Sequence, residues 1–267
     1  MIDRDSVAPY EAFFMDEAAK PLLLCDHASN HIPASLNDLG LSKQSLAQHI
    51  AYDIGAGGVT KLLSQALGYP ALLGGVSRLM IDLNRPVDDP TSIRQIYDHI
   101  IIKGNIGLDQ AAITHRIDTY FTPYHQAISD HLQQALMQRA ALPMILSIHS
   151  YTPKIRAKGV LQQRPWHLGI LSNQDRRLST IALDYFAQHH PELTIGDNLP
   201  YSGEDAYDYT LSTHVFPKGY LSLLVEIRQD LIDTQAGQEQ MAQLLLPLMQ
   251  KLDQAGSDLS KAADKEV

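Results

Sequence analysis

The sequence predicts an α/β fold. Short apolar runs, typical of buried strands, alternate along the 267 residues with segments whose apolar residues recur at helical spacing. The strongest runs cover residues 21–25, 143–148 and 220–227. Hydrophobic residues make up 45% of the chain and charged residues 19%, which indicates a folded protein with a sizeable core.

The expected elements follow in a regular order. We expect strands over residues 21–25, 71–73, 77–83, 143–148, 160–161, 167–171 and 220–227. We expect helices over residues 42–50, 54–67, 109–139, 174–189 and 238–254. Ser42 is a suitable N-cap, Gly68 a stop signal, and Pro123 a break within the third helix. No repeat or Pro, Gly or Ser-rich linker divides the chain, so we expect one domain over residues 1–267, with a core of about 20–255 between polar tails.

The charge balance excludes several classes of partner. A net charge of -9, from 30 acidic and 21 basic residues, gives no broad cationic surface for nucleic acid. The mixed charges of residues 1–20 do not resemble a secretory signal, and no apolar run approaches the ~20 residues that span a bilayer. Cys25 is the only cysteine, which excludes an intramolecular disulfide and a zinc site built from cysteines. We therefore expect a cytoplasmic protein with a small-molecule substrate and no membrane or nucleic-acid partner.

Three of the predicted strands end on a residue suited to catalysis. His27 follows the run of residues 21–25, His149 follows the run of residues 143–148, and Glu226 closes the run of residues 220–227. In open α/β sheets, ligands bind beyond the carboxyl ends of the strands. A single histidine or glutamate at a strand end is more often structural, but three such groups at one sheet edge indicate a site.

Two histidines and one carboxylate form the usual protein ligands of a catalytic zinc ion. His27 and His149 supply the imidazoles, and Asp53, at the entrance to a predicted helix, supplies the carboxylate. Asp53 would equally well cap that helix. Asp26 is a second candidate ligand, but its position beside His27 on a strand favours a role in orienting a histidine. Asn30 is a weaker candidate, because a neutral amide oxygen binds zinc poorly.

Glu226 is the natural general base. Burial at a strand end raises the pKa of a carboxylate and a nearby cation lowers it, a balance that suits proton transfer.

A second group of polar residues lies within residues 77–86. Strand alternation would place Arg78, Asp82 and Asn84 on one face. Asp82 lies among apolar residues and needs a partner, which Arg78 or Arg85 would supply. The pair Asn84 and Arg85 offers an amide and a planar guanidinium, which suit bidentate binding of a carboxylate.

Arg228 is a further candidate for binding a carboxylate. It lies two residues beyond Glu226 and therefore on the same strand face.

The chain resembles the N-formylglutamate amidohydrolase family in an ordered set of short motifs between residues 20 and 231. The matching pieces are Asp26-His27-Ala28-Ser29-Asn30 with Ile32-Pro33, Asp53 with Gly55, Ser77-Arg78 through Asp82-Leu83-Asn84-Arg85, Tyr124-His125, Ser147-Ile148-His149-Ser150, Tyr201-Ser202-Gly203 and Glu226 through Leu231. No single piece is specific, but their order is.

The resemblance implies a three-layer α/β/α fold with a central mixed, mostly parallel sheet, of the phosphorylase/hydrolase-like, zinc carboxypeptidase type. It implies that His27 and His149 bind the metal, Glu226 is the base and Arg85 binds a carboxylate. The related carboxypeptidases carry Glu three residues after the first histidine, where this chain has Asn30. Asp53 corresponds better to the acidic ligand of the related muramoyl-alanine amidases.

We therefore expect a zinc-dependent amidohydrolase that acts on a small acidic N-acyl amino acid, with N-formylglutamate the leading substrate. Arg78 or His125 would help to stabilise the oxyanion. The alternatives are another N-acyl amino acid or peptide amide as substrate, or an inactive small-molecule-binding member of the fold.

Overall fold

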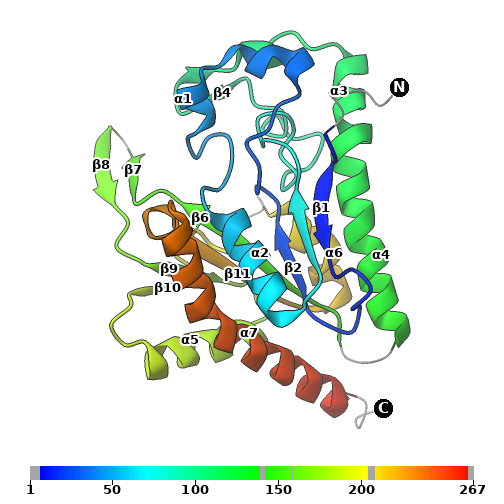
Figure 1. Ribbon diagram of the computed structural model, residues 1–267, viewed down its shortest axis with the longest axis vertical. Helices are drawn as coiled ribbons and strands as arrows, with labels where there is room; N and C mark the ends of the chain where they lie inside the picture. The colour runs from blue at the N-terminus through cyan, green and yellow to red at the C-terminus, as the bar shows by residue number, and fades with distance from the viewer. Residues whose placement is uncertain (1–6, 139–141, 158, 204–207, 264–267) are drawn as a thin grey trace.

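The computed structural model describes residues 7–138, 142–157, 159–203 and 208–263. A seven-stranded sheet runs through it in the order β1-β3-β2-β6-β11-β9-β10 (Figure 1). The strands are β1 (Tyr10–Phe13), β2 (Leu22–Cys25), β3 (Ala71–Gly74), β6 (Met144–Tyr151), β9 (Leu168–Leu171), β10 (Ile195–Asp197) and β11 (Leu221–Arg228). Neighbouring strands are parallel except in the pairs β1–β3 and β9–β11. The predicted mixed, mostly parallel sheet is confirmed.

Helices cover both faces of this sheet. The described α-helices are α1 (Lys43–Leu46), α2 (Ala56–Leu67), α3 (Gln110–Arg116), α4 (Thr122–Gln138), α5 (Arg177–His189), α6 (Tyr209–His214) and α7 (Gln235–Ala263). Of these, α2, α5 and α7 pack on one face of the sheet and α4 and α6 on the other. Alternate side chains of β2 enter two different cores, because successive residues of a strand point to opposite faces. Leu23 packs with residues of α2, α5 and α7, whereas Leu22 and Leu24 pack with residues of α4 and α6. The predicted three-layer arrangement is therefore present (Figure 1).

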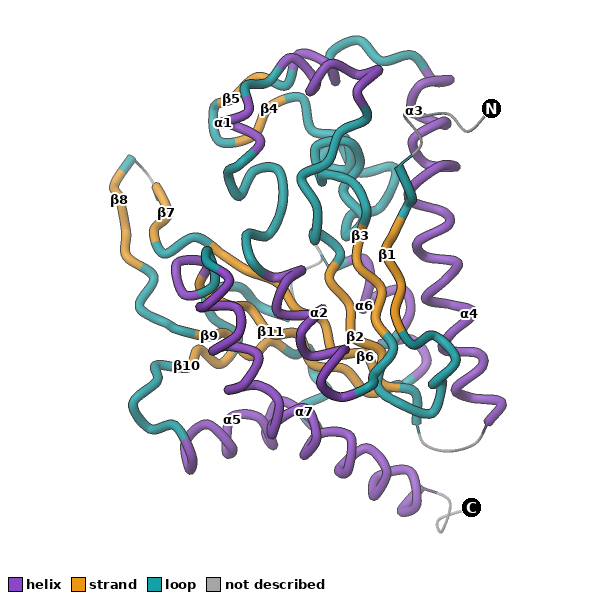
Figure 2. Tube along the Cα trace, in the orientation of Figure 1, coloured by secondary structure: helices purple, strands orange, loops and turns teal. Residues whose placement is uncertain are grey.

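Two short hairpins lie outside the main sheet. One joins β4 (Ile96–Tyr97) to β5 (Ile100–Ile101), and the other joins β7 (Lys154–Ala157) to β8 (Val160–Gln163). Figure 2 shows the β7–β8 hairpin projecting from the body of the molecule. It is inserted between the carboxyl end of β6 and the start of β9, so its base lies at the sheet edge where β6 ends.

The predicted strand over residues 77–83 is wrong. These residues form consecutive turns, in which the Met80 N–H donates to the Ser77 carbonyl over 2.8 Å. The segment is buried but its backbone is held by a loop, since the Arg78 N–H and the Ser77 hydroxyl both donate to the Ala51 carbonyl. The apolar alternation reflects burial of a coil, and Met80 lies in the core.

The helical predictions differ from the structure mainly at their ends. The expected helix over residues 42–50 is short, although Ser42 caps it as predicted. A π-helical turn over Ile117–Phe121 joins α3 to α4 in place of a break at Pro123. The C-terminal helix continues to Ala263. The sequence did not predict β1, β4, β5, β7, β10 or α6, which are short.

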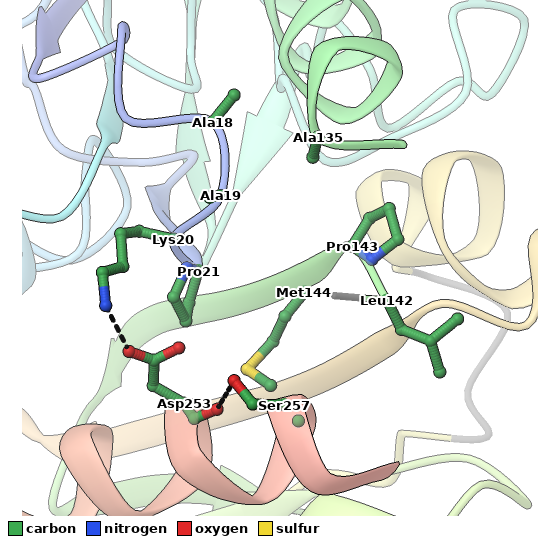
Figure 3. A pocket seen from close by; sticks show the side chains of 11 residues that line it. Ala18, Ala19, Lys20, Pro21, Ala135, Leu142, Pro143, Met144, Asp253 and Ser257 are labelled. Atoms are coloured by element: carbon green, nitrogen blue, oxygen red, sulfur yellow. Dashed lines mark hydrogen bonds and ion pairs between the residues drawn. The ribbon is translucent and has the colours of Figure 1, made fainter. Parts of the chain in front are cut away.

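The amino ends of the central strands are closed by α7. Figure 3 shows Asp253 of α7 beside Lys20, just before β2. Nζ of Lys20 lies 3.0 Å from Oδ2 of Asp253. The Tyr69 hydroxyl donates to the same carboxylate over 2.6 Å. The gap between these elements measures about 10 Å³, space for one water molecule at most. No described helix has the length and apolarity that crossing a membrane requires.

Candidate active site

A cavity of about 280 Å³ opens at the carboxyl ends of β2, β6 and β11. Its wall is formed by His27, Asp53, Arg78, Asn84, Arg85, Tyr97, His149, Ser150, Leu171, Tyr201, Ser202, Gly203, Asp208, Leu224 and Glu226. This is the sheet edge at which the sequence places its strand-end groups.

Strand register brings the three predicted strand-end residues together. His149 in β6 and Glu226 in β11 are direct partners across the parallel pair. His27 lies two residues beyond the end of the neighbouring strand β2, and its ring centre is 5.4 Å from that of His149. All three side chains are at least nine-tenths buried.

Asp53 reaches this group from the loop before α2. Its backbone N–H donates to the His27 carbonyl over 2.9 Å, which fixes the loop against the end of β2. Its Oδ2 lies 2.9 Å from Nδ1 of His149 and 3.4 Å from Nδ1 of His27. One ligand atom from each of these three residues lies within 4.8 Å of the other two, so one ion could contact them all.

The state of the His27 ring fits a metal ligand. Its Nε2 lies 2.7 Å from Oδ1 of Asp82, while its Nδ1 is buried and makes no hydrogen bond to a described residue. A buried nitrogen without a hydrogen bond is costly, and an ion would satisfy it. Two imidazoles and a carboxylate are the donor set of catalytic zinc sites, so the residues present fit the expected metal.

His149 is also held through the ring nitrogen that does not face Asp53. Its Nε2 lies 3.0 Å from the Ser147 hydroxyl and 3.5 Å from Oδ2 of Asp26. Burial alone would raise the pKa of Asp26, but the hydrogen bond and charge of His149 and the charge of His27 lower it. Asp26 is therefore an anion that faces Nε2 of His149, as expected of a residue that orients a histidine.

Asn30 lies away from the three-residue group. It is exposed, and its amide donates to the Leu46 carbonyl over 2.9 Å. Among the three candidates for the third protein ligand, the structure groups Asp53 with the histidines.

Arg78 forms an ion pair with Oδ1 of Asp53, on the side opposite the histidines. Burial would raise the pKa of Asp53, but the charges of Arg78 and His27 and the hydrogen bond of His149 hold it well below its usual range. The carboxylate is therefore ionised and fixed in orientation.

Glu226 has the environment of a proton carrier. Burial raises the pKa of its carboxyl to about 7, against the lowering charges of His149 and Arg78. Its Oε2 is buried and makes no hydrogen bond to a described residue. A carboxyl whose pKa lies near neutrality can both take up and release a proton at physiological pH.

Asn84 and Arg85 line the same cavity. The Thr210 N–H donates to Oδ1 of Asn84 over 2.8 Å, which leaves the amide NH₂ as the donor group. Nη1 of Arg85 donates to the Asn84 carbonyl over 2.9 Å. The two side chains thus present donors side by side, as carboxylate binding requires.

Two predicted substrate-binding residues lie outside the cavity wall. His125 is buried beneath residue 83, with Nε2 2.8 Å from the Leu83 carbonyl and Nδ1 2.9 Å from Nε2 of His214. Arg228 donates through Nε to Asp230 over 2.8 Å. Neither side chain lines the cavity, so we assign neither of them a substrate contact.

The sequence reading did not single out Tyr97, Ser150, Tyr201 or Asp208, which the structure adds to the cavity wall. Tyr201 and Ser150 belong to motifs that the family resemblance already contained, so that signal was present. Asp208 caps α6 by accepting from the Leu211 N–H, and burial raises the pKa of its carboxyl. Tyr97 lies in a two-residue strand and carries no sequence signal.

Comparisons with solved structures and family models identify the fold of this chain and its relatives. The chain is 32% identical to the gene product Atu2144 of Agrobacterium tumefaciens, whose crystal structure superposes with a TM-score of 0.84 over 94% of this chain and 96% of that one. An N-formylglutamate amidohydrolase from Ralstonia eutropha, 19% identical, superposes with a TM-score of 0.65 over 97% of this chain and all of that one, which shows a shared fold. No curated protein matches. The family model for N-formylglutamate amidohydrolase matches residues 19–233, well over half of the chain, and the chain therefore belongs to the N-formylglutamate amidohydrolase family.

Proposed function

We propose that this chain is a metal-dependent amidohydrolase that converts N-formylglutamate and water to glutamate and formate. Membership of the family supports hydrolysis of an amide. The observation that carries the proposal is the meeting of His27, Asp53 and His149 with Glu226 in one cavity.

His27, Asp53 and His149 would hold one divalent ion, which we propose is zinc. When bound, such an ion supplies a Lewis acid that polarises the amide carbonyl and makes water more acidic. Asp82 and Asp26 keep the two imidazoles in place through their other nitrogens, and Arg78 does the same for the Asp53 carboxylate. The protein thus fixes the ligands before the substrate arrives.

Glu226 acts as the general base and then as the general acid. Its carboxylate takes a proton from the attacking water and passes it to the nitrogen of the departing glutamate. Both transfers need a group whose pKa lies near neutrality, which burial provides here.

Asn84 and Arg85 bind a carboxylate of the substrate. They line the cavity that contains the proposed base and metal ligands, so a carboxylate held by them would orient the amide toward the reacting groups. The Arg78 guanidinium borders the same cavity and is available to stabilise a developing oxyanion.

The test is a panel of N-formyl, N-acetyl and N-succinyl amino acids assayed with zinc-loaded protein and with Glu226→Gln. We expect N-formyl-L-glutamate to be the best substrate and Glu226→Gln to lower kcat about 10²- to 10⁴-fold while it still binds zinc. Near-wild-type turnover by zinc-loaded Glu226→Gln would overturn the mechanism. Absence of hydrolysis by the zinc-loaded wild type would favour an inactive binding protein.

A further inference from the structure

A second cavity of about 420 Å³ adjoins the active-site cavity. Its wall shares Asp53, Arg78, Tyr97, Ser150 and Tyr201 with the first. The rest of its wall comes from the base of the β7–β8 hairpin and the residues that flank it, and from His49, Asp98 and His99. A substrate held at the active site can therefore extend into this space.

The wall of this second cavity carries more cationic than acidic side chains, whereas the chain as a whole has a net negative charge. Three cationic side chains, Lys154, Arg156 and Arg164, line it with no ion pair to a described residue. Each of its two acidic residues already contacts a basic side chain: Asp53 forms an ion pair with Arg78, and Asp98 lies 2.9 Å from His49. This cavity is suited to an anion.

Arg164 is the cation placed to bind that anion. Its residue is only 7% exposed, and a buried charge normally has a charged partner. Nη1 donates to the Tyr201 hydroxyl over 3.0 Å and to the Thr152 carbonyl and hydroxyl over 3.4 Å. Nε and Nη2 make no hydrogen bond to a described residue, which leaves one edge of the guanidinium for a ligand.

Arg116 shows what a structural arginine looks like in this chain. It is also buried, but two of its nitrogens donate to the oxygens of Met80, Asn105 and Gly104, and it lines neither cavity. Arg164 differs because all its side-chain hydrogen bonds come from Nη1 and because it lines a cavity.

The orientation of Arg164 is fixed before any ligand binds. Its guanidinium lies 4.9 Å from the ring centre of Tyr201 and 5.5 Å from that of Tyr151, and its backbone N–H donates to the Pro153 carbonyl over 2.9 Å. A planar guanidinium held in this way matches the two oxygens of a carboxylate. Tyr201 borders both cavities, so the site of Arg164 is adjacent to the active site.

We infer that Arg164 binds a second carboxylate of the substrate, the one on the amino-acid side chain, while Asn84 and Arg85 bind the first. The inference deepens the proposed function and rests on it. It makes Arg164 the residue that selects acidic N-acyl amino acids over neutral ones, since an amide in place of the carboxylate would leave the guanidinium without its counter-charge.

The first test compares N-formyl-L-glutamate with N-formyl-L-glutamine as substrates of zinc-loaded wild type and Arg164→Met. We expect the wild type to prefer the glutamate compound, and Arg164→Met to lower kcat/KM for it about 10- to 100-fold, mainly through KM. Turnover of the glutamine compound should stay within about 3-fold, so that the preference disappears. Arg176→Met is the matched control, because Arg176 pairs with Asp197 away from both cavities, and it should keep the preference.

The second test does not depend on turnover. Glutarate carries two carboxylates at the spacing found in glutamate, and butyrate carries one, so calorimetric binding of both to zinc-loaded protein isolates the second carboxylate. Wild type should bind glutarate more tightly than butyrate, and Arg164→Met should not. If Arg164→Met does not fold, Arg164→Lys replaces it and should weaken the same preferences, because an ammonium cannot make the bidentate contact.

The outcomes separate the two proposals. An Arg164 variant that keeps the glutamate and glutarate preferences would overturn the assignment of Arg164 and leave the proposed function intact. A wild type that cleaves neither formyl amide would overturn the proposed function, and the glutarate comparison would then decide on Arg164 by itself.

Discussion

Asp82 and His27 are joined by a hydrogen bond of 2.7 Å between Oδ1 and Nε2, on the side of the ring away from Asp53. Burial would raise the pKa of Asp82, but the charge and hydrogen bond of His27 hold it below its usual range. The ionised carboxylate accepts a hydrogen bond from Nε2–H, which leaves Nδ1 as the ring nitrogen that faces Asp53 and His149. Asp82 thus sets which nitrogen of His27 can bind a metal ion.

We expect Asp82→Asn to weaken zinc binding about 10- to 100-fold, because a neutral amide no longer fixes that tautomer. Competition with a chromophoric chelator measures the affinity. Asp98→Asn is a matched control, since Asp98 is also hydrogen-bonded to a histidine, the partly exposed His49 at 2.9 Å, which lies outside the ligand group. Equal zinc affinity in wild type and Asp82→Asn would contradict this role.

Gly55 holds the loop that presents Asp53. Its φ is +78°, and a Cβ at this position would overlap the Ile232 carbonyl. Gly55→Ala should therefore lower the free energy of unfolding and also weaken zinc binding. Gly68→Ala, at the other end of α2, has a similar φ of +65° with no atom within 4 Å. It should cost about 1–2 kcal/mol in denaturant unfolding and leave zinc binding unchanged. If Gly55→Ala and Gly68→Ala had the same zinc affinity, the loop at Gly55 would not position Asp53 for metal binding.

The raised pKa of Glu226 predicts a pH-dependent stability in the metal-free protein. Its carboxyl moves from an ordinary value of 4.5 to about 7, so between these values the folded state binds more protons than the unfolded state. This stabilising contribution is complete below pH 4.5 and is lost as the pH rises through 7.

Glu226→Gln lacks this titration. Its free energy of unfolding, relative to that of the wild type, should therefore increase between pH 5 and pH 8, by about 3 kcal/mol at most. Urea unfolding of both proteins across this range measures the difference. A difference that does not change with pH would mean that Glu226 is not titrating near neutrality.

Arg85→Met should raise KM for N-formyl-L-glutamate about 10- to 100-fold with a smaller change in kcat, because a carboxylate contact exists in both the bound substrate and the transition state. Arg228→Met removes a guanidinium that pairs with Asp230 outside the cavity and should change KM little. Steady-state kinetics of Arg85→Met and Arg228→Met, compared by their KM for N-formyl-L-glutamate, show which of the two arginines binds the substrate carboxylate. A larger effect at Arg228 would reverse the assignment of the carboxylate-binding residue.

The sequence predicted the parts of the site that stand on buried strands. Continuous apolar runs before His27, His149 and Glu226 identified three central strands, and the parallel arrangement that brings their ends together followed from the α/β pattern. The structure groups Asp53, not Asp26, with the two histidines, and strand alternation accounts for this because it turns Asp26 toward Nε2 of His149, away from the group.

The sequence failed where long-range packing decides the conformation. The alternation over residues 77–83 suggested a strand, although the segment is a buried coil that brings Arg78 and Asp82 to the site by a different geometry. His125 and Arg228 have the right chemistry, but their partners, Leu83 and Asp230, hold them away from the cavity. Arg164 has no periodic pattern around it, and only the folded base of the hairpin places it beside the site.

The most direct test of the metal site is an anomalous difference map, recorded at the zinc edge, from crystals of the zinc-loaded protein. We predict one peak at about 2.0–2.2 Å from Nδ1 of His27, Nδ1 of His149 and a carboxylate oxygen of Asp53. A peak at another place, or one contacted by only one of these three side chains, would contradict the account.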